Sequence, residues 1–289
     1  MTKVYKVNAF VQNNNGGNPA GVVVDSENLN EDDMQKIAHD MGFSETAFIL
    51  PSQQANFTLR FFTPNKEVDL CGHATIASFH LLREQKLIDH GKYTMETKAG
   101  ILDIDCLQDG LIYMQQNVPQ FCEVIPVQEI APCLNLGEEK FSHDIQVVST
   151  GLRKIFAPIC DLPTLESIVP NYDNIIEVSK KYTVTGIYCF TLQVESCTAR
   201  CRNFAPLVGI YEDAATGTSA AALSCYLVQH RLQKVEACTQ FSFEQGYSIA
   251  APSLLKTRLQ IENEQITHVE VAGRAQTEKC VEWSNNNGS

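Results

Sequence analysis

Three ionisable side chains stand in this sequence where a proton could be moved. Glu45 lies between Gly42-Phe-Ser and an apolar run, and partial loss of water at the head of a buried strand suits a carboxylate for general acid–base catalysis. His73 follows a glycine that opens a helix, where it could bind an anion or shuttle a proton. Asp213 lies four residues before a second such glycine, where it could face a bound ligand.

Each of these three residues also has a purely structural interpretation. Glu45 could be an exposed loop glutamate that follows a helix. His73 could be a solvent-facing residue of a first helical turn. Asp213 could complement the positive end of a helix dipole. The sequence pattern alone leaves both interpretations open for each residue.

Two glycines, Gly72 and Gly217, open uncharged helices and indicate an anion site. Free backbone N–H groups and the helix dipole both favour negative charge at a helix N-terminus. Thr218 and Ser219 add hydroxyl groups beside Gly217, or serve as ordinary N-capping residues. We expect the two helix starts to hold a small anion, such as a carboxylate, across a cleft.

Cys71 directly precedes Gly72 and is a candidate reactive thiol, because a helix N-terminus stabilises a thiolate. The alternative is burial, as we expect for most of the eleven cysteines, which read as small hydrophobic residues of a reducing cytoplasm. The position that matches Cys71 before Gly217 is Thr216, so a symmetric pair of thiols is absent. Cys197 and Cys201 have no histidine near them, and we predict no metal site.

An internal repeat predicts the elements that position these residues. Arg-x-Phe-x-Pro begins at Arg60 and again at Arg202, an offset of 202 − 60 = 142 residues. Phe48 and Phe190 stand in short apolar runs at the same offset. We therefore expect two similar lobes, 1–120 and 121–289, that meet near the prolines of residues 117–135. Residues 275–285 should pack back on the first lobe.

The apolar pattern predicts helices at 29–41, 73–86, 172–181 and 217–232. The first should begin at Asn30 as its N-cap and end at Gly42. The helices at 73–86 and 217–232 are nearly free of charge and should be buried on all sides. Many short strands surround them in the sequence. The fold class is therefore α+β, with two pseudo-symmetric lobes that each curl a mostly antiparallel sheet around a central helix. The strands are expected near 3–10, 21–25, 45–50, 56–63, 92–127, 145–158, 186–203, 240–249 and 256–271.

Composition excludes several classes of protein. The chain has 289 residues, of which 44% are hydrophobic and 19% charged, as in a globular protein. The net charge is 22 − 34 = −12, and no basic run occurs, so we expect no nucleic-acid or anionic-membrane partner. No signal-peptide core and no run of membrane-spanning length is present, which favours a cytoplasmic location.

These motifs together resemble the PhzF-like family of phenazine biosynthesis, within the diaminopimelate epimerase-like superfamily. The resemblance implies two sheet-wrapped helices with the site between the lobes, a homodimer, and an isomerase that needs no cofactor. It places the catalytic roles on Glu45, His73 and Asp213, and substrate binding on Asn18, Gly72, Gly217, Thr218 and Ser219. The motifs that carry it are Gly17-Asn18-Pro19, Gly42-Phe-Ser-Glu-Thr-Ala-Phe, Leu70-Cys-Gly-His-Ala-Thr and Glu212-Asp-Ala-Ala-Thr-Gly-Thr-Ser-Ala.

The chain departs from its relatives in two places. Thr218 stands where the phenazine enzyme has a serine, which keeps a hydroxyl but adds a methyl group. Diaminopimelate epimerases have a cysteine at Cys71 and a second one at Thr216, so epimerisation with two thiols is not expected here. The resemblance does not identify the substrate or make phenazine biosynthesis the pathway.

We therefore expect a cofactor-independent isomerase that acts by proton transfer on a small carboxylate metabolite. Glu45 would be the acid/base, and Asp213 would orient His73 or a polar group of the substrate. A second hypothesis is a racemase, epimerase or dehydratase that uses Cys71 as its base. A third is a small-molecule binding protein without catalysis.

Overall fold

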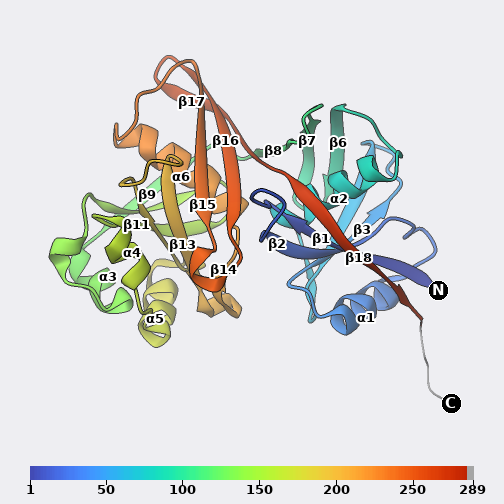
Figure 1. The fold of residues 1–289 in the computed structure, drawn as a ribbon, viewed down its shortest axis with the longest axis horizontal. Coiled ribbons are helices and arrows are strands. Elements are labelled where there is room, and N and C mark those ends of the chain that lie inside the picture. Colours follow the sequence, from blue (N-terminus) through green and yellow to red (C-terminus); the bar gives the residue numbers. More distant parts are fainter. Residues whose placement is uncertain (285–289) are drawn as a thin grey trace. The chain divides into compact units, whose positions relative to one another are not determined.

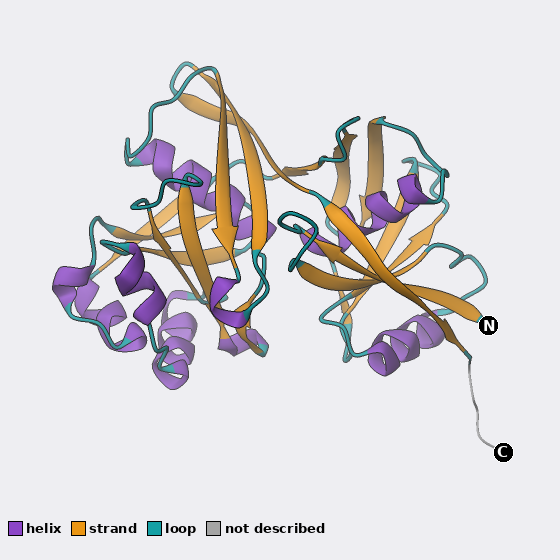
Figure 2. Cartoon of the chain, viewed as in Figure 1, coloured by secondary structure: helices purple, strands orange, loops and turns teal. Residues whose placement is uncertain are grey.

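The structure is a computed structural model, and it describes residues 1–284. The chain forms two compact units (Figure 1). The first unit comprises Met1–Gln115 together with the chain from Ala272 onward, and the second comprises Gln116–Val271. Among the described residues, strands outnumber helices in both units (Figure 2).

The first unit is one curled sheet with two helices. Its strands pair in the order β18–β1–β2–β3–β4–β6–β7, with short β5 added to β4. The pairs β2–β3 and β4–β6 are parallel, and the other pairs are antiparallel. The elements are β1 (Thr2–Ala9), β2 (Asn18–Val23), α1 (Glu31–Met41), β3 (Thr46–Leu50), β4 (Phe57–Phe62), β5 (Glu67–Val68), α2 (Gly72–Glu84), β6 (Gly91–Thr97), β7 (Gly100–Cys106), β8 (Ile112–Gln116) and β18 (Ala275–Trp283).

The second unit repeats this plan. Its strands pair in the order β9–β10–β11–β12–β13–β15–β16, with short β14 added to β13. The pairs β11–β12 and β13–β15 are parallel. The elements are β9 (Gln120–Ile125), α3 (Val127–Leu134), β10 (Ile145–Ser149), β11 (Arg153–Pro158), α4 (Leu162–Ser167), α5 (Tyr172–Tyr182), β12 (Ile187–Thr191), β13 (Ala199–Ala205), β14 (Ile210–Asp213), α6 (Gly217–Gln229), β15 (Cys238–Gln245), β16 (Ser253–Glu262) and β17 (Gln265–Gly273).

The matching strand order confirms the internal repeat, but one residue match was wrong. Arg60 pairs with Phe48 across β3 and β4, whereas Arg202 pairs with Cys189 across β12 and β13. The structural counterpart of Phe48 is therefore Cys189 rather than Phe190. Adjacent strand residues point to opposite faces, so a slip of one residue changes which face a side chain occupies.

The repeated arginine motif has a structural reason. Each arginine forms a two-pronged ion pair with a glutamate of the next short strand, Arg60 with Glu67 and Arg202 with Glu212, at 2.7–2.9 Å. Each guanidinium also lies over the phenylalanine two residues later, about 5 Å from the ring centre. Positions i and i+2 share a face of a strand, which explains Arg-x-Phe. The pair fixes the segment that leads into α2 or α6.

Helices α2 and α6 are buried nearly all round, as the absence of charge predicted. Phe79 of α2 contacts the rings of Phe57 on β4 and Tyr93 on β6. Tyr226 of α6 packs against Phe156 on β11 and Phe190 on β12. Each sheet therefore curls around its own helix, which confirms the predicted fold class.

The ends of these two helices come earlier than predicted. Helix α2 ends at Glu84 and α6 at Gln229, rather than at residues 86 and 232. Two residues beyond each end the backbone is left-handed, at Lys86 (φ 60°) and Arg231 (φ 54°). A left-handed residue stops a helix, and neither lysine nor arginine signals that conformation in a sequence.

The remaining helices cover the outer faces of the sheets. Helix α1 has the predicted caps, because Asn30 Oδ1 accepts a hydrogen bond from Asp33 and Gly42 is left-handed. Helices α3, α4 and α5 cover the second unit's sheet through Leu134, Leu165 and Ile175. The sequence did not predict α3, because its Pro132 suggested a linker. Pro132 is the sixth of the eight helix residues, so it removes one helical hydrogen bond, the one to the carbonyl of Gln128.

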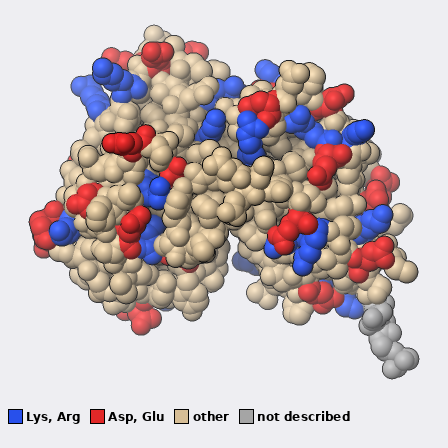
Figure 3. Space-filling model, viewed as in Figure 1, with Lys and Arg blue, Asp and Glu red and all other residues tan. Residues whose placement is uncertain are grey.

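The charged side chains lie mostly at the surface. Acidic and basic residues are interspersed on the face drawn in Figure 3, and exposed pairs such as Arg153 with Glu123 and Lys181 with Glu129 join several of them. Exposed pairs of this kind contribute about 0–1 kcal/mol each. Within residues 1–284, no helix has the length and apolar character needed to span a membrane.

Candidate functional site

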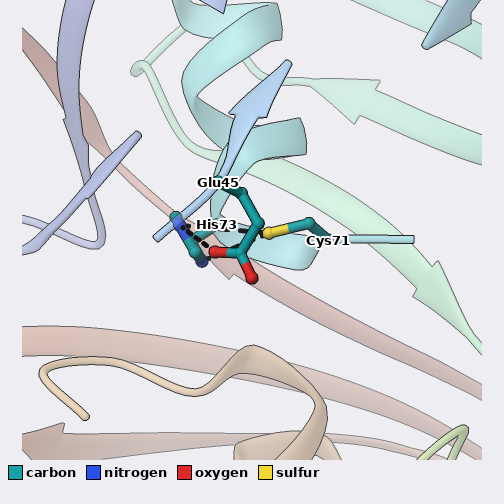
Figure 4. Close-up of side chains that lie close together, drawn as sticks. All are labelled: Glu45, Cys71 and His73. Atoms are coloured by element: carbon teal, nitrogen blue, oxygen red, sulfur yellow. Dashed lines mark hydrogen bonds and ion pairs between the residues drawn. The ribbon is translucent and has the colours of Figure 1, made fainter. Parts of the chain in front are cut away.

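Glu45, Cys71 and His73 meet at the N-terminus of α2 in the first unit (Figure 4). His73 Nε2 lies 3.4 Å from Glu45 Oε2 and 3.3 Å from the hydroxyl of Ser44. Cys71 Sγ lies 3.4 Å from His73 Nδ1 and 3.9 Å from His73 Nε2. The histidine and glutamate side chains are 11% and 17% exposed, so both retain access to a ligand.

The local backbone explains how Glu45 reaches this place. Helix α1 ends at Gly42, and β3 begins at Thr46, so Glu45 stands at the corner between them. Its carbonyl accepts a hydrogen bond from the backbone N–H of Gly21 at 3.0 Å. A Cβ at Gly21 would lie 2.6 Å from Thr46 Oγ1, so only glycine allows β2 and β3 to approach this closely. The glutamate is thus fixed by backbone contacts.

The imidazole of His73 can link the carboxylate to the thiol. A neutral imidazole donates from one nitrogen and accepts at the other. If Nε2 donates to Glu45, then Nδ1 accepts from Cys71, and a protonated ring donates to both. In each state the sulfur stays within 3.4–3.9 Å of the two ring nitrogens, and Glu45 stays at Nε2. The arrangement can therefore store or pass one proton without moving the backbone.

The start of α2 is suited to an anion. Cys71 is the N-cap residue, and its side chain makes no capping hydrogen bond. In the described chain, apart from the two neighbouring residues and the backbone of the helix itself, no atom lies within 4 Å of the place where a Cβ of Gly72 would stand. The first-turn N–H groups therefore lack a side-chain cap, and glycine leaves room for a ligand to approach them.

The second group of predicted residues lies at the start of α6 in the second unit. Asp213 ends β14, and its Oδ2 accepts a hydrogen bond from the Thr216 hydroxyl at 2.5 Å. Gly217 opens the helix, and Thr218 follows as a partly exposed residue. Ser219 is buried, with 3% of its surface exposed. The predicted residues therefore form two clusters, one in each unit.

Asn18 lies apart from both helix starts in the sequence. It is the first residue of β2, it is 6% exposed, and it pairs with Ala9 of β1. It belongs to the same unit as Glu45 and His73. Its role in substrate binding stays a prediction.

The first cluster also has donor atoms that a metal ion could use. One oxygen of Glu45, the sulfur of Cys71 and one nitrogen of His73 all lie within 4.8 Å of one another. Zinc takes these three donor types, and catalytic zinc sites often have three protein ligands. Cys197 and Cys201 form no comparable cluster within the described residues. Cys201 is buried, and burial raises the pKa of its thiol.

The sequence missed two groups of polar residues near the predicted ones. Ser44 adds a hydroxyl beside His73, and its place in Gly-Phe-Ser-Glu was the available signal. In the second unit, Lys154 and Asn203 are buried and connect to Asp213 through hydrogen bonds. A lysine that precedes the apolar run Ile155–Ala157 was the signal for the second group.

Sequence comparison finds relatives over nearly the whole chain. The family model of phenazine biosynthesis-like proteins matches residues 7–279. A protein of Clostridium acetobutylicum named as an uncharacterized isomerase is 33% identical over 285 residues, which covers 94% of each chain. The trans-2,3-dihydro-3-hydroxyanthranilate isomerase of Pseudomonas chlororaphis is 29% identical and covers 94% of this chain and 95% of its own.

Structural comparison agrees with the sequence relatives. The crystal structure of a PhzF-family phenazine biosynthesis protein from Bacillus anthracis has a TM-score of 0.90 and 31% identity, and covers 97% of this chain and 98% of its own. A probable proline racemase from Agrobacterium radiobacter has a TM-score of 0.64 at 12% identity, and covers 99% of this chain and 93% of its own. The second match shows a shared fold alone.

Proposed function

The chain belongs to the family of phenazine biosynthesis-like proteins and is an isomerase, and from this premise we propose that it moves a proton on a small carboxylate without a cofactor. Glu45 takes a proton from one carbon of the substrate and returns it to another. One C–H bond breaks, one forms, and the double bond shifts between them. No oxidant, reductant or water is consumed.

The observation that carries this proposal is the 3.4 Å contact between Glu45 and His73 beside an open helix start. His73 can hold the carboxylate of Glu45 in place and supply or accept its proton. The N–H groups at Gly72 and Gly217, with the hydroxyls of Thr218 and Ser219, would bind the substrate carboxylate. Asn18 would add a polar contact, and Asp213 would orient a substrate hydroxyl or amine.

The substrate is proposed as a class. The relative from Pseudomonas chlororaphis is named for a dihydro-hydroxyanthranilate, which is a cyclic carboxylate with a hydroxyl and an amine. A polar carboxylate of this type suits the roles proposed for the helix starts and for Asp213.

Proton exchange in heavy water tests the proposal. Carboxylates that raise the melting temperature would be incubated with the protein in heavy water, and deuterium in the recovered molecule would be measured by mass spectrometry. Glu45→Gln keeps the shape of the side chain but cannot carry the proton. It should lower turnover by about 10²–10⁴-fold, the usual contribution of general acid–base catalysis. The melting temperature should change little.

A matched control variant separates the loss of one negative charge from the loss of the proposed acid/base. Glu27 is exposed and lies in the same unit, so Glu27→Gln removes one charge without touching the cluster. It should leave turnover unchanged. Near-normal turnover by Glu45→Gln would refute the assignment of Glu45 as the acid/base.

A second candidate mechanism uses Cys71 as the base. The specific observation in its favour is the 3.4 Å contact between Cys71 Sγ and His73 Nδ1, since an adjacent imidazole can deprotonate a thiol. Cys71→Ala distinguishes the two mechanisms. The Glu45 mechanism predicts turnover within several-fold of wild type, whereas the Cys71 mechanism predicts loss of turnover. The isomerase names of the relatives count against a binding protein without catalysis.

A further inference from the structure

A buried chain of hydrogen bonds runs through the second unit to Asp213. The ammonium group of Lys154 on β11 donates to Asn203 Oδ1 on β13 at 2.9 Å. Asn203 Nδ2 donates to Thr216 Oγ1 at 2.7 Å. Thr216 Oγ1 donates to Asp213 Oδ2 at 2.5 Å. Lys154 and Asn203 are 3% and 2% exposed, so water does not replace these bonds.

The hydrogen bonds from Lys154 to Asp213 all have the same donor-to-acceptor direction. A protonated lysine can only donate, so it fixes the oxygen of the Asn203 amide toward itself and the NH₂ group toward Thr216. A hydroxyl has one proton and two acceptor sites. Thr216 Oγ1 receives bonds from Asn203 Nδ2 and from Gln245 Nε2, the latter at 3.1 Å. Both acceptor sites are filled, so its proton goes to Asp213.

A second arm fixes Gln245 in the same orientation. The hydroxyl of Tyr188 donates to Gln245 Oε1 at 2.9 Å, and the backbone N–H of Thr216 donates to the same oxygen at 3.3 Å. Gln245 Nε2 also donates to the backbone carbonyl of Asp213 at 2.8 Å. Tyr188 and Gln245 are completely buried. Two arms therefore converge on Thr216 and Asp213.

Burial of the charged ammonium group of Lys154 is unfavourable for folding. It lies on the α6 side of the sheet, since its neighbour Ile155 packs into the core on the other side. Burial lowers the pKa of Lys154 to about 8, and the charge of Asp213 acts in the opposite direction. Burial raises the pKa of Tyr188 and Cys201 on the adjacent strands, so both stay neutral. Asp213 is therefore the charged group that interacts with Lys154.

We propose that Lys154 is a positioning residue that holds Asp213 in its ionised, hydrogen-bond-accepting form through Asn203 and Thr216. The inference rests on the proposed role of Asp213 at the substrate. An ionised Asp213 with one oxygen held by Thr216 has its carboxylate in a fixed orientation. It would select substrates that present a donor there, such as a hydroxyl or an ammonium group.

Two substitutions test the proposal, one that reverses a hydrogen bond between Lys154 and Asp213 and one that removes the first donor. Asn203→Asp keeps the side-chain volume and gives Lys154 a carboxylate partner. The new side chain can accept but not donate, so the Thr216 proton turns toward it and away from Asp213. Lys154→Met removes the first donor and keeps a similar length. Both changes should raise the pH at which Asp213 titrates, because its ionised form loses stabilisation.

The titration can be followed without knowing the substrate. Carbon-13 NMR of labelled aspartate carboxyl groups reports the midpoint, and loss of the signal in Asp213→Asn assigns it. We expect midpoints higher by about one pH unit or more in Asn203→Asp, and a smaller rise in Lys154→Met. Melting curves establish that each variant is folded.

Gln146→Leu is the matched control. Gln146 is also buried in the second unit, but it bonds to His230 beyond the other end of α6, at 2.8 Å. It should lower stability and leave the midpoint of Asp213 in place. The proposal is overturned if folded Asn203→Asp and Lys154→Met titrate like this control. If the midpoints move but Asp213→Asn keeps normal turnover, the coupling stands and the role of Asp213 in the proposed reaction is wrong.

Discussion

The buried Lys154 makes a measurable prediction about stability and pH. Its pKa is lowered from 10.5 to about 8 in the folded protein, because burial disfavours the charged form. Between these two values the unfolded chain binds more protons than the folded one, so stability rises with pH. The difference of about 2.5 units corresponds to about 3 kcal/mol, since each unit is worth 1.36 kcal/mol. Full burial means that solvent screening does not reduce this value.

Lys154→Met removes the titrating group and isolates its contribution. The lost hydrogen bond to Asn203 is the same at every pH, so it changes the offset between the two proteins but not the slope. Cysteines and tyrosines titrate alike in both proteins and cancel in the difference. The stability of wild type relative to Lys154→Met should therefore increase by about 2–3 kcal/mol between pH 7 and pH 10.

Urea denaturation followed by circular dichroism measures this difference. The experiment needs a reductant, because the eleven cysteines are free thiols. Equal m-values for the two proteins would show that the comparison is sound. A difference in stability that stays constant from pH 7 to pH 10 would refute the lowered pKa of Lys154. Lys154, the first donor in the series of hydrogen bonds that leads to Asp213, would then be fully charged.

Three further predictions concern the repeat, the anion site and assembly. Arg202→Met should destabilise the protein by about 3–5 kcal/mol, because it leaves Glu212 buried without its partner, and the more exposed Arg60→Met should cost less in the same urea assay. Gly217→Pro removes an N–H donor and should weaken sulfate or carboxylate binding by calorimetry, with unchanged affinity counting against the site. Sedimentation at micromolar concentration should show a homodimer of twice 32.1 kDa, and a monomer would remove that expectation.

The sequence predicted the large features of the fold for physical reasons. Helices nearly free of charge had to be buried on most sides, and α2 and α6 are. Asn30 and Gly42 signalled both ends of α1, because capping chemistry is local. The repeated Arg-x-Phe motif marked two equivalent strands, which the structure shows at β4 and β13.

The features that the sequence did not predict depend on three-dimensional contacts. Lys154 and Asp213 are far apart in the sequence, and only the curl of the sheet brings Asn203 and Thr216 between them. The contact between Cys71 and His73 spans two residues, yet it needed the backbone angles before the helix to be known. Pro132 was misread because Ile130, Cys133 and Leu134 around it pack into the core, and the sequence does not show that this burial offsets the hydrogen bond that the proline removes.

The residue before each helix-opening glycine contacts a candidate site residue and does not cap its helix. Thr216 is a good N-capping residue by type, and a capping bond would add about 1 kcal/mol to stability. Its side chain makes no such bond and is directed to Asp213 instead. Cys71 at the matching position also leaves the helix uncapped and contacts His73.

Both units therefore leave the first N–H groups of the central helix without a side-chain cap. In each case the N-cap side chain contacts an ionisable residue that we assign to the reaction. A local rule of helix stability is broken twice at equivalent places, and functional sites are where such breaks are expected. A purely structural protein would gain from capping both helices. The uncapped starts of α2 and α6 are better explained by a ligand that takes the place of the cap.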